Sequence, residues 1–257
     1  AGGTGALPHL FLLVFLFFLL LNYGSVVGAG IVGASIAWNL ARRGKPVLIL
    51  DQTGIGKGAT GRSFGWINAN FAETPAYFAL RSAAIDAHHE MEAALGPVAT
   101  RWTGCLWWED EGASFDAHVA ELAAFGYEAQ VVARPEIARM APALATPPDQ
   151  AIHVAREGGA DGEVIAARLI EAAVALGAKI WIGPKANGFL RQGGRVIGVA
   201  TDHGPVPASQ VIVAAGAGAA TLTGLPMANK PGLILRTRPL PAILGPIIMA
   251  PDVHFRQ

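Results

Sequence analysis

The chain has 257 residues, of which 52% are hydrophobic and 15% are charged, a composition typical of a folded globular protein. Nineteen Lys and Arg residues balance nineteen Asp and Glu residues, so no basic surface for nucleic acid or anionic lipid is expected. The single cysteine, Cys105, excludes an internal disulfide framework and a multi-cysteine metal site. The seven histidines show no metal-ligand spacing, and no metal is expected.

Residues 1–21 form an apolar N-terminal segment whose role the sequence leaves open. Its unbroken apolar run, 10–21, is shorter than the roughly 20 residues that a transmembrane helix needs. It also lacks the basic region and small-residue cleavage site of a secretory signal. An extra apolar element, a translation artefact and a membrane anchor remain as alternatives. We expect a cytoplasmic protein, with membrane association through this segment as the other reading.

A complete strand–turn–helix–strand pattern follows this segment. Residues 25–28 end a buried strand, and 31–43 have the apolar spacing of a helix. Residues 46–50 are a continuous apolar run, typical of a parallel strand covered on both faces, and the run ends in Asp51. Between the first strand and the helix stands a GxGxxG motif, Gly28-Ala29-Gly30-Ile31-Val32-Gly33. This context predicts a Rossmann-type dinucleotide-binding unit.

Each position of the motif has a physical task. Gly28 permits the tight turn, Gly30 lets the backbone approach a pyrophosphate, and Gly33 lets the helix pack closely on the strand. The helix N-terminus presents free N–H groups and a positive dipole to the phosphates. The Asp51 carboxylate is expected to accept hydrogen bonds from ribose hydroxyls, which disfavours the 2′-phosphate of NADP.

A second Gly-rich loop, within 53–70, comes next and bears on the choice between FAD and NAD. A nicotinamide-dependent dehydrogenase usually continues after Asp51 with further strand–helix units of the same sheet. Here the loop can instead wrap along an extended dinucleotide, which favours FAD. Its middle reads Ala59-Thr60-Gly61-Arg62-Ser63. An NAD-dependent dehydrogenase remains the alternative.

The rest of the chain alternates between two patterns. A helix is predicted over 75–95, followed by short strands and helices near 115–125 and 135. A helix over 161–177 and strands over 179–182, 188–191, 196–201 and 206–214 restore the α/β pattern, and a new strand region begins at 235. We therefore expect an α/β fold in which a Rossmann-type FAD-binding domain (22–98 and 156–233) is interleaved with a substrate domain (99–155 and 234–257). The substrate domain is expected to be incomplete and built on a mostly antiparallel sheet.

Several of these segments together resemble the D-amino-acid oxidase family of flavoenzymes, which includes glycine oxidase, sarcosine oxidase and amino-acid dehydrogenases. The resemblance rests on the GxGxxG turn, the strand end at Asp51 and the loop 59–66. It extends to 157–162, before the later helix, and to 211–217. Members of the family continue beyond the position of Gln257, so the resemblance implies a chain truncated at its C-terminus.

The resemblance also implies a set of cofactor contacts. Asp51 and Gln52 are placed at the adenosine, and Ala59 and Thr60 at the pyrophosphate. Ala186 stands where the family usually has a valine whose backbone contacts adenine. The flavin end is assigned to Phe64, Gly65 and Trp66, and the turn beside the cofactor to Ala215 and Gly216.

The implied reaction is transfer of a hydride from the carbon next to the amine of an amino acid or secondary amine to the flavin. The small-molecule amine is the expected partner, together with a second copy or a partner subunit; no nucleic acid is expected. A non-catalytic or partial FAD-binding subunit is a further alternative. The catalytic residues are unknown. Four arginines are candidates to clamp a substrate carboxylate, although a solvated or phosphate-side position is the stronger expectation for each: Arg62, Arg236, Arg238 and Arg256.

Overall fold

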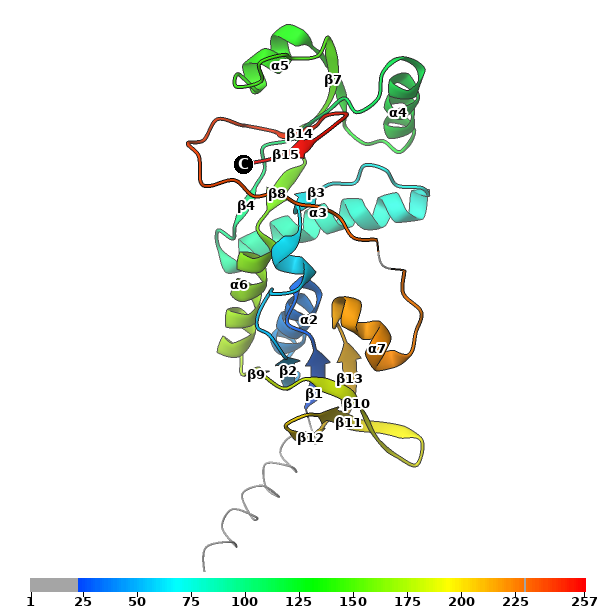
Figure 1. Ribbon diagram of the computed structural model, residues 1–257, viewed down its shortest axis with the longest axis vertical. Coiled ribbons are helices and arrows are strands. Elements are labelled where there is room, and N and C mark those ends of the chain that lie inside the picture. Colours follow the sequence, from blue (N-terminus) through cyan, green and yellow to red (C-terminus); the bar gives the residue numbers. More distant parts are fainter. Residues whose placement is uncertain (1–22, 229) are drawn as a thin grey trace, which may run out of the picture. The chain divides into compact units, whose positions relative to one another are not determined.

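The computed structural model describes residues 23–228 and 230–257 (Figure 1). The predictions for the apolar segment 1–21 fall outside these residues. No helix within the described ranges is long and apolar enough to cross a membrane. The chain divides into two compact units, one made of residues up to 63 and 162–233, the other of 64–161 and 234–257.

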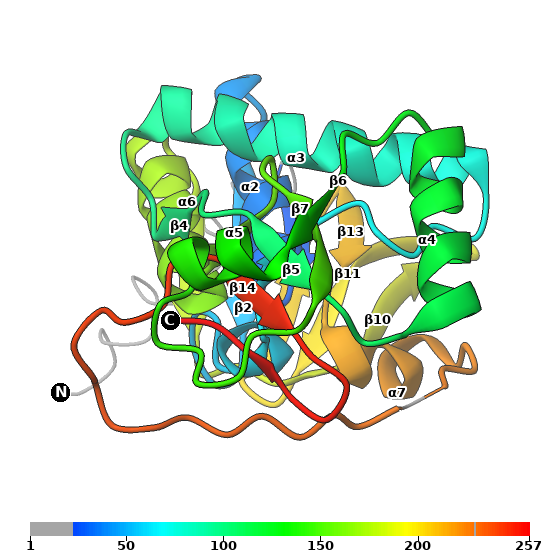
Figure 2. The ribbon, with the colours of Figure 1, turned by 90° about the horizontal axis from the view of Figure 1, so that it is seen from above.

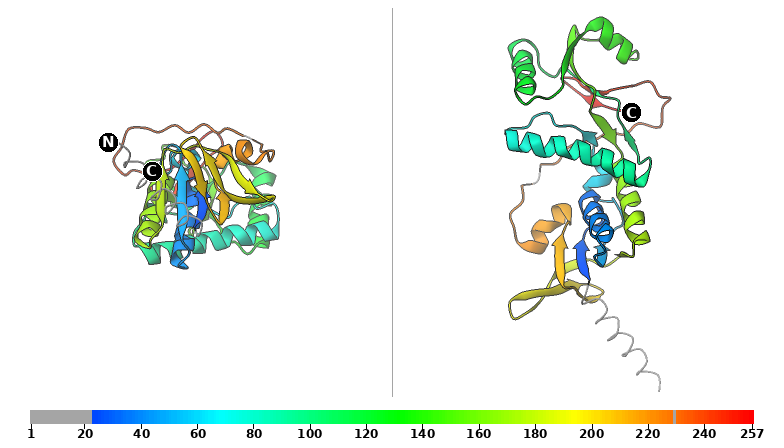
Figure 3. Two further views of the ribbon diagram at one scale, coloured as in Figure 1. Left: turned by 90° about the horizontal axis from the view of Figure 1, so that it is seen from below. Right: turned by 180° about the vertical axis from the view of Figure 1, so that it is seen from behind.

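The first unit is built on a four-stranded parallel sheet of order β13-β1-β2-β9. Its two central strands are mostly apolar and covered on both faces, and Val26 and Ile49 are fully buried. The helices α2 (Ile31–Arg42) and α6 (Gly162–Ala175) pack against each other (Figure 3). The four strands are β1 (Gly24–Val27), β2 (Val47–Asp51), β9 (Lys179–Ile182) and β13 (Gln210–Val213).

A three-stranded antiparallel sheet completes this unit, with strands β10 (Ala186–Gln192), β11 (Arg195–Thr201) and β12 (Gly204–Pro207). Its residues Val199 and Val206 share an apolar cluster with Val27, Leu48 and Leu50 of the parallel sheet. The sequence predicted one strand over 206–214, and this was wrong. The chain leaves the antiparallel sheet after β12 and joins the parallel sheet as β13. The short elements of this unit are η1 (Ala59–Arg62), η2 (Gly216–Gly218) and α7 (Ala219–Thr223).

The second unit contains a five-stranded sheet of order β15-β14-β5-β7-β6, antiparallel except for the pair β14 and β5. These two strands lie side by side although they are far apart in the sequence (Figure 2). The strands are β5 (Cys105–Trp107), β6 (Gln130–Ala133), β7 (Gln150–Val154), β14 (Ile247–Met249) and β15 (His254–Phe255). A smaller antiparallel sheet joins β3 (Trp66–Ile67), β8 (Gly158–Ala160) and β4 (Thr100–Arg101).

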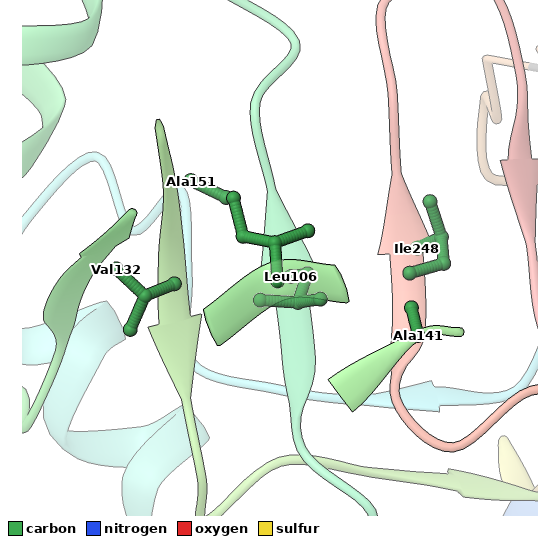
Figure 4. Packing of buried hydrophobic residues seen from close by; sticks show 6 residues of the cluster. Leu106, Val132, Ala141, Ala151 and Ile248 are labelled. Atoms are coloured by element: carbon green, nitrogen blue, oxygen red, sulfur yellow. The ribbon is translucent and has the colours of Figure 1, made fainter. Parts of the chain in front are cut away.

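Three helices belong to the second unit: α3 (Pro75–Leu95), α4 (Gly112–Ala124) and α5 (Arg134–Met140). The sequence placed the residues of α3 in the FAD-binding domain (22–98). The apolar core of this unit lies where α5 covers the five-stranded sheet (Figure 4). Leu106 and Ile248 from neighbouring strands are fully buried there, beside Ala141 at the end of α5.

The strand region predicted from residue 235 was also wrong, because regular structure resumes only with β14 at Ile247. Leu233 and Leu235 are 87% and 84% exposed. Pro239 and Pro241 interrupt this stretch and have no N–H group for a sheet ladder. The apolar pattern alone therefore gave a misleading signal.

Candidate functional site

The turn between β1 and α2 can be formed only with glycine at position 28. The Gly28 N–H donates to the Leu50 carbonyl at 2.7 Å, and its φ of +112° lies where side chains are strongly disfavoured. A Cβ atom here would stand 2.3 Å from the Ala214 carbonyl oxygen of the neighbouring chain segment. Gly28 thus lets the backbone turn while lying flat against the end of β13.

Gly33 brings α2 onto this turn. A Cβ atom at Gly33 would lie 1.9 Å from the Gly28 carbonyl oxygen, so no side chain fits. The absence of a side chain places the first turn of α2 directly beyond the ends of the parallel strands. Ligands of open α/β sheets bind at this position.

The N-terminus of α2 has an acceptor supplied from a distant loop. Gly30 at the N-cap has no side chain to cap the helix, and the Ile31 N–H instead donates to Thr60 Oγ1 at 2.9 Å. A Cβ atom at Gly30 would come within 3.0 Å of that hydroxyl. The first turn of α2 contains no acidic residue. Its remaining N–H groups and the positive helix dipole suit an anion.

Asp51 fixes two backbone segments at the end of β2. Its Oδ2 accepts the Ala29 N–H at 2.8 Å, and its Oδ1 accepts the N–H groups of Thr53 and Gly54 at 2.8 and 2.9 Å. The sequence assigned Asp51 to a ribose and gave no sign of these contacts. Its Oδ1 also accepts the Thr53 hydroxyl at 3.2 Å, so the acceptor capacity left for a ligand lies on Oδ2. Gln52 beside it is exposed.

The second Gly-rich loop is bound to the first. Gly56 donates its N–H to the Ala29 carbonyl at 3.0 Å, and Thr60 in η1 contacts the start of α2 as described. Lys57 forms an ion pair with Glu163 in the first turn of α6, which the sequence reasoning missed. The predicted loop residues Ala59, Thr60, Gly61, Arg62 and Ser63 thus lie on a loop anchored beside the GxGxxG turn.

Three other predicted positions belong to the same unit. Ala186 begins β10 and, like Ala215, packs against the apolar cluster around Val27 and Leu50. The Ala215 Cα lies 3.1 Å from the place of a Gly28 Cβ, so this segment borders the turn directly. Gly216 begins η2 with a φ of +54°.

The residues assigned to the flavin end, Phe64, Gly65 and Trp66, belong to the second unit. Gly65 has a φ of +70°, and a Cβ atom there would lie 2.1 Å from the Ala160 carbonyl oxygen. Arg256 donates to that same carbonyl at 2.8 Å and also to the Phe64 carbonyl. Burial lowers the pKa of its guanidinium. The other carboxylate-clamp candidates, Arg62, Arg236 and Arg238, are exposed.

Sequence reasoning did not single out Glu157, which is a fully buried carboxyl group in the second unit. Its Oε2 accepts Trp66 Nε1–H, and its Oε1 accepts Asn70 Nδ2–H and the Tyr127 hydroxyl, each at 2.7 Å. Burial raises the pKa of Glu157 to about 7, against the opposing effect of these hydrogen bonds. The signal available in the sequence was its place at the start of the segment 157–162, which carries part of the family resemblance.

Cys105 lies in β5 with no exposed surface. Burial raises the pKa of its thiol, with Glu157 nearby adding to the effect. A buried neutral thiol is a poor nucleophile. In the described part of the chain, no group of three or more His, Cys, Asp and Glu side chains could hold a metal ion.

The geometry of the first unit defines a dinucleotide-binding protein. The family of FAD-dependent oxidoreductases represented by the D-amino-acid oxidases (DAO) matches residues 25–257. The chain belongs to this family, which confirms FAD as its cofactor and excludes the NAD-dependent alternative. The α/β fold expected from the sequence is confirmed with it.

The chain is similar to several individual proteins. Hydrogen cyanide synthase subunit HcnC of Pseudomonas aeruginosa is 29% identical over 287 aligned positions, which cover 90% of this chain and 68% of the relative. Glycine oxidase from Geobacillus kaustophilus superimposes with a TM-score of 0.75 and 22% identity, covering 89% of this chain and 66% of that chain. L-proline dehydrogenase from P. horikoshii gives 0.76 and 23%, covering 89% and 64%. The chain thus spans about two thirds of the length of these proteins.

The described residues fit FAD. The three motif glycines stand where added Cβ atoms would meet backbone or the Thr60 hydroxyl, which leaves an open backbone cradle at the start of α2. Asp51 retains acceptor capacity, and the loop around Thr60 is bound beside the cradle.

Proposed function

We propose that this chain supplies the FAD-binding part, and a portion of the substrate-binding part, of an enzyme that oxidises an amino acid or secondary amine. The observation that carries the proposal is the turn Gly28–Gly33 at the end of a parallel strand, with the Thr60 loop bound beside it. The family membership of the chain supports the same class of reaction.

The proposed cofactor contacts follow the geometry of the first unit. The N–H groups at the start of α2 and the loop 59–63 would hold the pyrophosphate. The Asp51 carboxylate would accept hydrogen bonds from the adenosine ribose, with Gln52 beside it and the backbone of Ala186 toward the adenine. The segment Ala215–Gly216 borders the same turn.

When bound, FAD supplies the chemistry, as the acceptor of a hydride from the carbon next to the substrate amine. The protein's task is to bind and orient the substrate and to exclude water. We assign the flavin end to Phe64–Trp66, and Arg256 donates to the Phe64 carbonyl and to the Ala160 carbonyl. In this structure the Arg256 guanidinium is thus bound to backbone carbonyls, which makes it a poor candidate for a substrate carboxylate clamp.

A second candidate function is a flavoprotein subunit that needs a partner for activity. It is favoured by the name of the relative HcnC, which is a subunit of hydrogen cyanide synthase. In this reading the chain binds FAD but no amine reduces the flavin until a partner or further segment is added.

Anaerobic titration separates the two candidates. The purified chain is loaded with FAD, and its absorption spectrum is followed while D-amino acids, glycine, sarcosine and proline are added one at a time. Bleaching of the flavin by one compound supports the enzyme and names its substrate class. A bound flavin that none of them bleaches, but that bleaches after addition of a partner subunit, supports the second candidate.

A further inference from the structure

Glu157 collects hydrogen bonds from three separate segments of the second unit. Trp66 begins β3, Asn70 lies in the loop after it, and Tyr127 follows α4. All three donate to the one carboxyl group at 2.7 Å. Such a convergence of donors on a fully buried group fixes the segments relative to each other.

The same network also binds the backbone between Trp66 and Asn70. The Tyr127 hydroxyl, while donating to Glu157, accepts the Ala69 N–H at 3.2 Å. The strand and loop 66–70 are thus fixed at two side chains and one backbone group. This segment begins at Trp66, which is one of the residues assigned to the flavin end.

The network suits an ionised carboxylate. Trp66 and Asn70 can only donate through the atoms concerned, and a carboxylate accepts at both oxygens. A neutral acid carries a proton on one oxygen, so one of the three donors must give up its bond or, in the case of the Tyr127 hydroxyl, reverse it and accept. Burial works in the other direction and favours the neutral form.

Glu157 is the group in this network that changes charge near neutral pH. Burial and the nearby carboxylate raise the pKa values of Cys105 and Tyr127, so both stay neutral. The cations that face the network are Arg81 and Arg156. Arg81 is itself held by the carbonyl of Asn68.

We propose that Glu157 is a positioning residue for the flavin end of the site: as a carboxylate it holds Trp66, Asn70 and Tyr127 in one geometry, and as a neutral acid it loses or reverses one of these three hydrogen bonds. The inference rests on the proposed function for the placement of this segment beside the flavin. Flavin binding and amine oxidation should then respond to the protonation of a side chain that touches neither cofactor nor substrate.

The first test reads the segment itself, without FAD. In nitrogen-15-labelled protein, the Trp66 indole N–H resonance, assigned with Trp66→Phe, is followed from about pH 5.5 to about pH 8.5. We expect it to shift with a midpoint near neutral pH and to stop titrating in Glu157→Gln. A resonance that does not titrate, or that titrates unchanged in Glu157→Gln, would overturn the proposal.

Two further variants keep the test decisive if Glu157→Gln does not fold. Tyr127→Phe removes a hydrogen bond that favours the carboxylate, so the midpoint should move to higher pH; an unchanged midpoint counts against the proposal. Glu92→Gln is the matched control, because Glu92 accepts the indole N–H of Trp102 at 2.8 Å in the same unit. It should leave the Trp66 titration unaltered.

The second test asks whether the effect reaches the flavin. The dissociation constant of FAD is measured by fluorescence at about pH 6 and about pH 8. We expect a change of at least about threefold in the wild type and none in Glu157→Gln. A wild type that binds FAD equally at both pH values contradicts the flavin-end assignment. A chain that binds no FAD refutes the proposed function, while the indole titration still decides the role of Glu157.

Discussion

Thr60 offers a sharp perturbation of the proposed cofactor site. Its hydroxyl accepts the Ile31 N–H at 2.9 Å and so replaces the N-cap side chain that Gly30 cannot provide. Thr60→Val keeps the branched shape of the side chain but removes the acceptor. The N–H at the start of α2 is then left without its protein partner, and the loop loses its direct bond to the helix.

The free-energy cost of removing the Thr60 acceptor follows from the known contribution of helix N-caps. Loss of an N-cap acceptor destabilises a helix or protein by about 1 kcal/mol, which corresponds to a factor of about five in an equilibrium constant. Because the proposed pyrophosphate site needs both α2 and the loop in place, we expect the FAD dissociation constant to rise about fivefold in Thr60→Val. The free energy of unfolding should fall by about 1 kcal/mol.

The assay is a titration of apoprotein with FAD, followed by flavin fluorescence, beside urea unfolding of the same samples. Thr60→Ser is the matched control, since it retains the hydroxyl and should stay within about twofold of the wild type, well under 1 kcal/mol. Thr60→Val with wild-type affinity for FAD and wild-type stability would refute the capping argument and the placement of the loop at the pyrophosphate.

Three other outcomes follow from the structure. Gly33→Ala puts a Cβ atom 1.9 Å from the Gly28 carbonyl oxygen. Thermal unfolding should therefore show a loss of about 3 kcal/mol or more in the free energy of unfolding, and FAD binding should be abolished. The control Ser35→Ala, in the same helix, should keep wild-type stability and FAD binding. Cys105, with no exposed surface and a raised thiol pKa, should react with a thiol reagent only after unfolding in urea. The pKa of Glu157, about 7 when folded against an ordinary 4.5, means that the folded state binds more protons between these values. Urea unfolding should therefore show stability falling by about 2.5 kcal/mol from about pH 5 to about pH 8, and a flat or rising profile would contradict it.

The sequence predicted the parts of the fold that depend on local pattern. The strand, turn and helix around Gly28 follow from glycine spacing and apolar runs, and α3 was predicted with its observed ends. The short apolar run at 233–235 misled because hydropathy does not report whether a chain finds a partner strand.

The contacts that organise the site were not predictable in the same way. The Thr60–Ile31 bond joins residues 29 positions apart, and the Glu157–Trp66 bond joins residues 91 positions apart. Neither pair has a periodic or compositional mark, since each depends on how whole elements pack. The resemblance located the cofactor segments, but the network around Glu157 required the structure.

The central claim is that this chain binds FAD through the turn Gly28–Gly33. The most direct measurement is equilibrium dialysis of the purified chain against FAD and, separately, against NAD, with Gly33→Ala dialysed in parallel. The account predicts a stoichiometric bound-flavin spectrum in the wild type, no retained NAD, and no flavin in Gly33→Ala. Retention of NAD in place of FAD, or FAD bound equally by the folded Gly33→Ala variant, would contradict it.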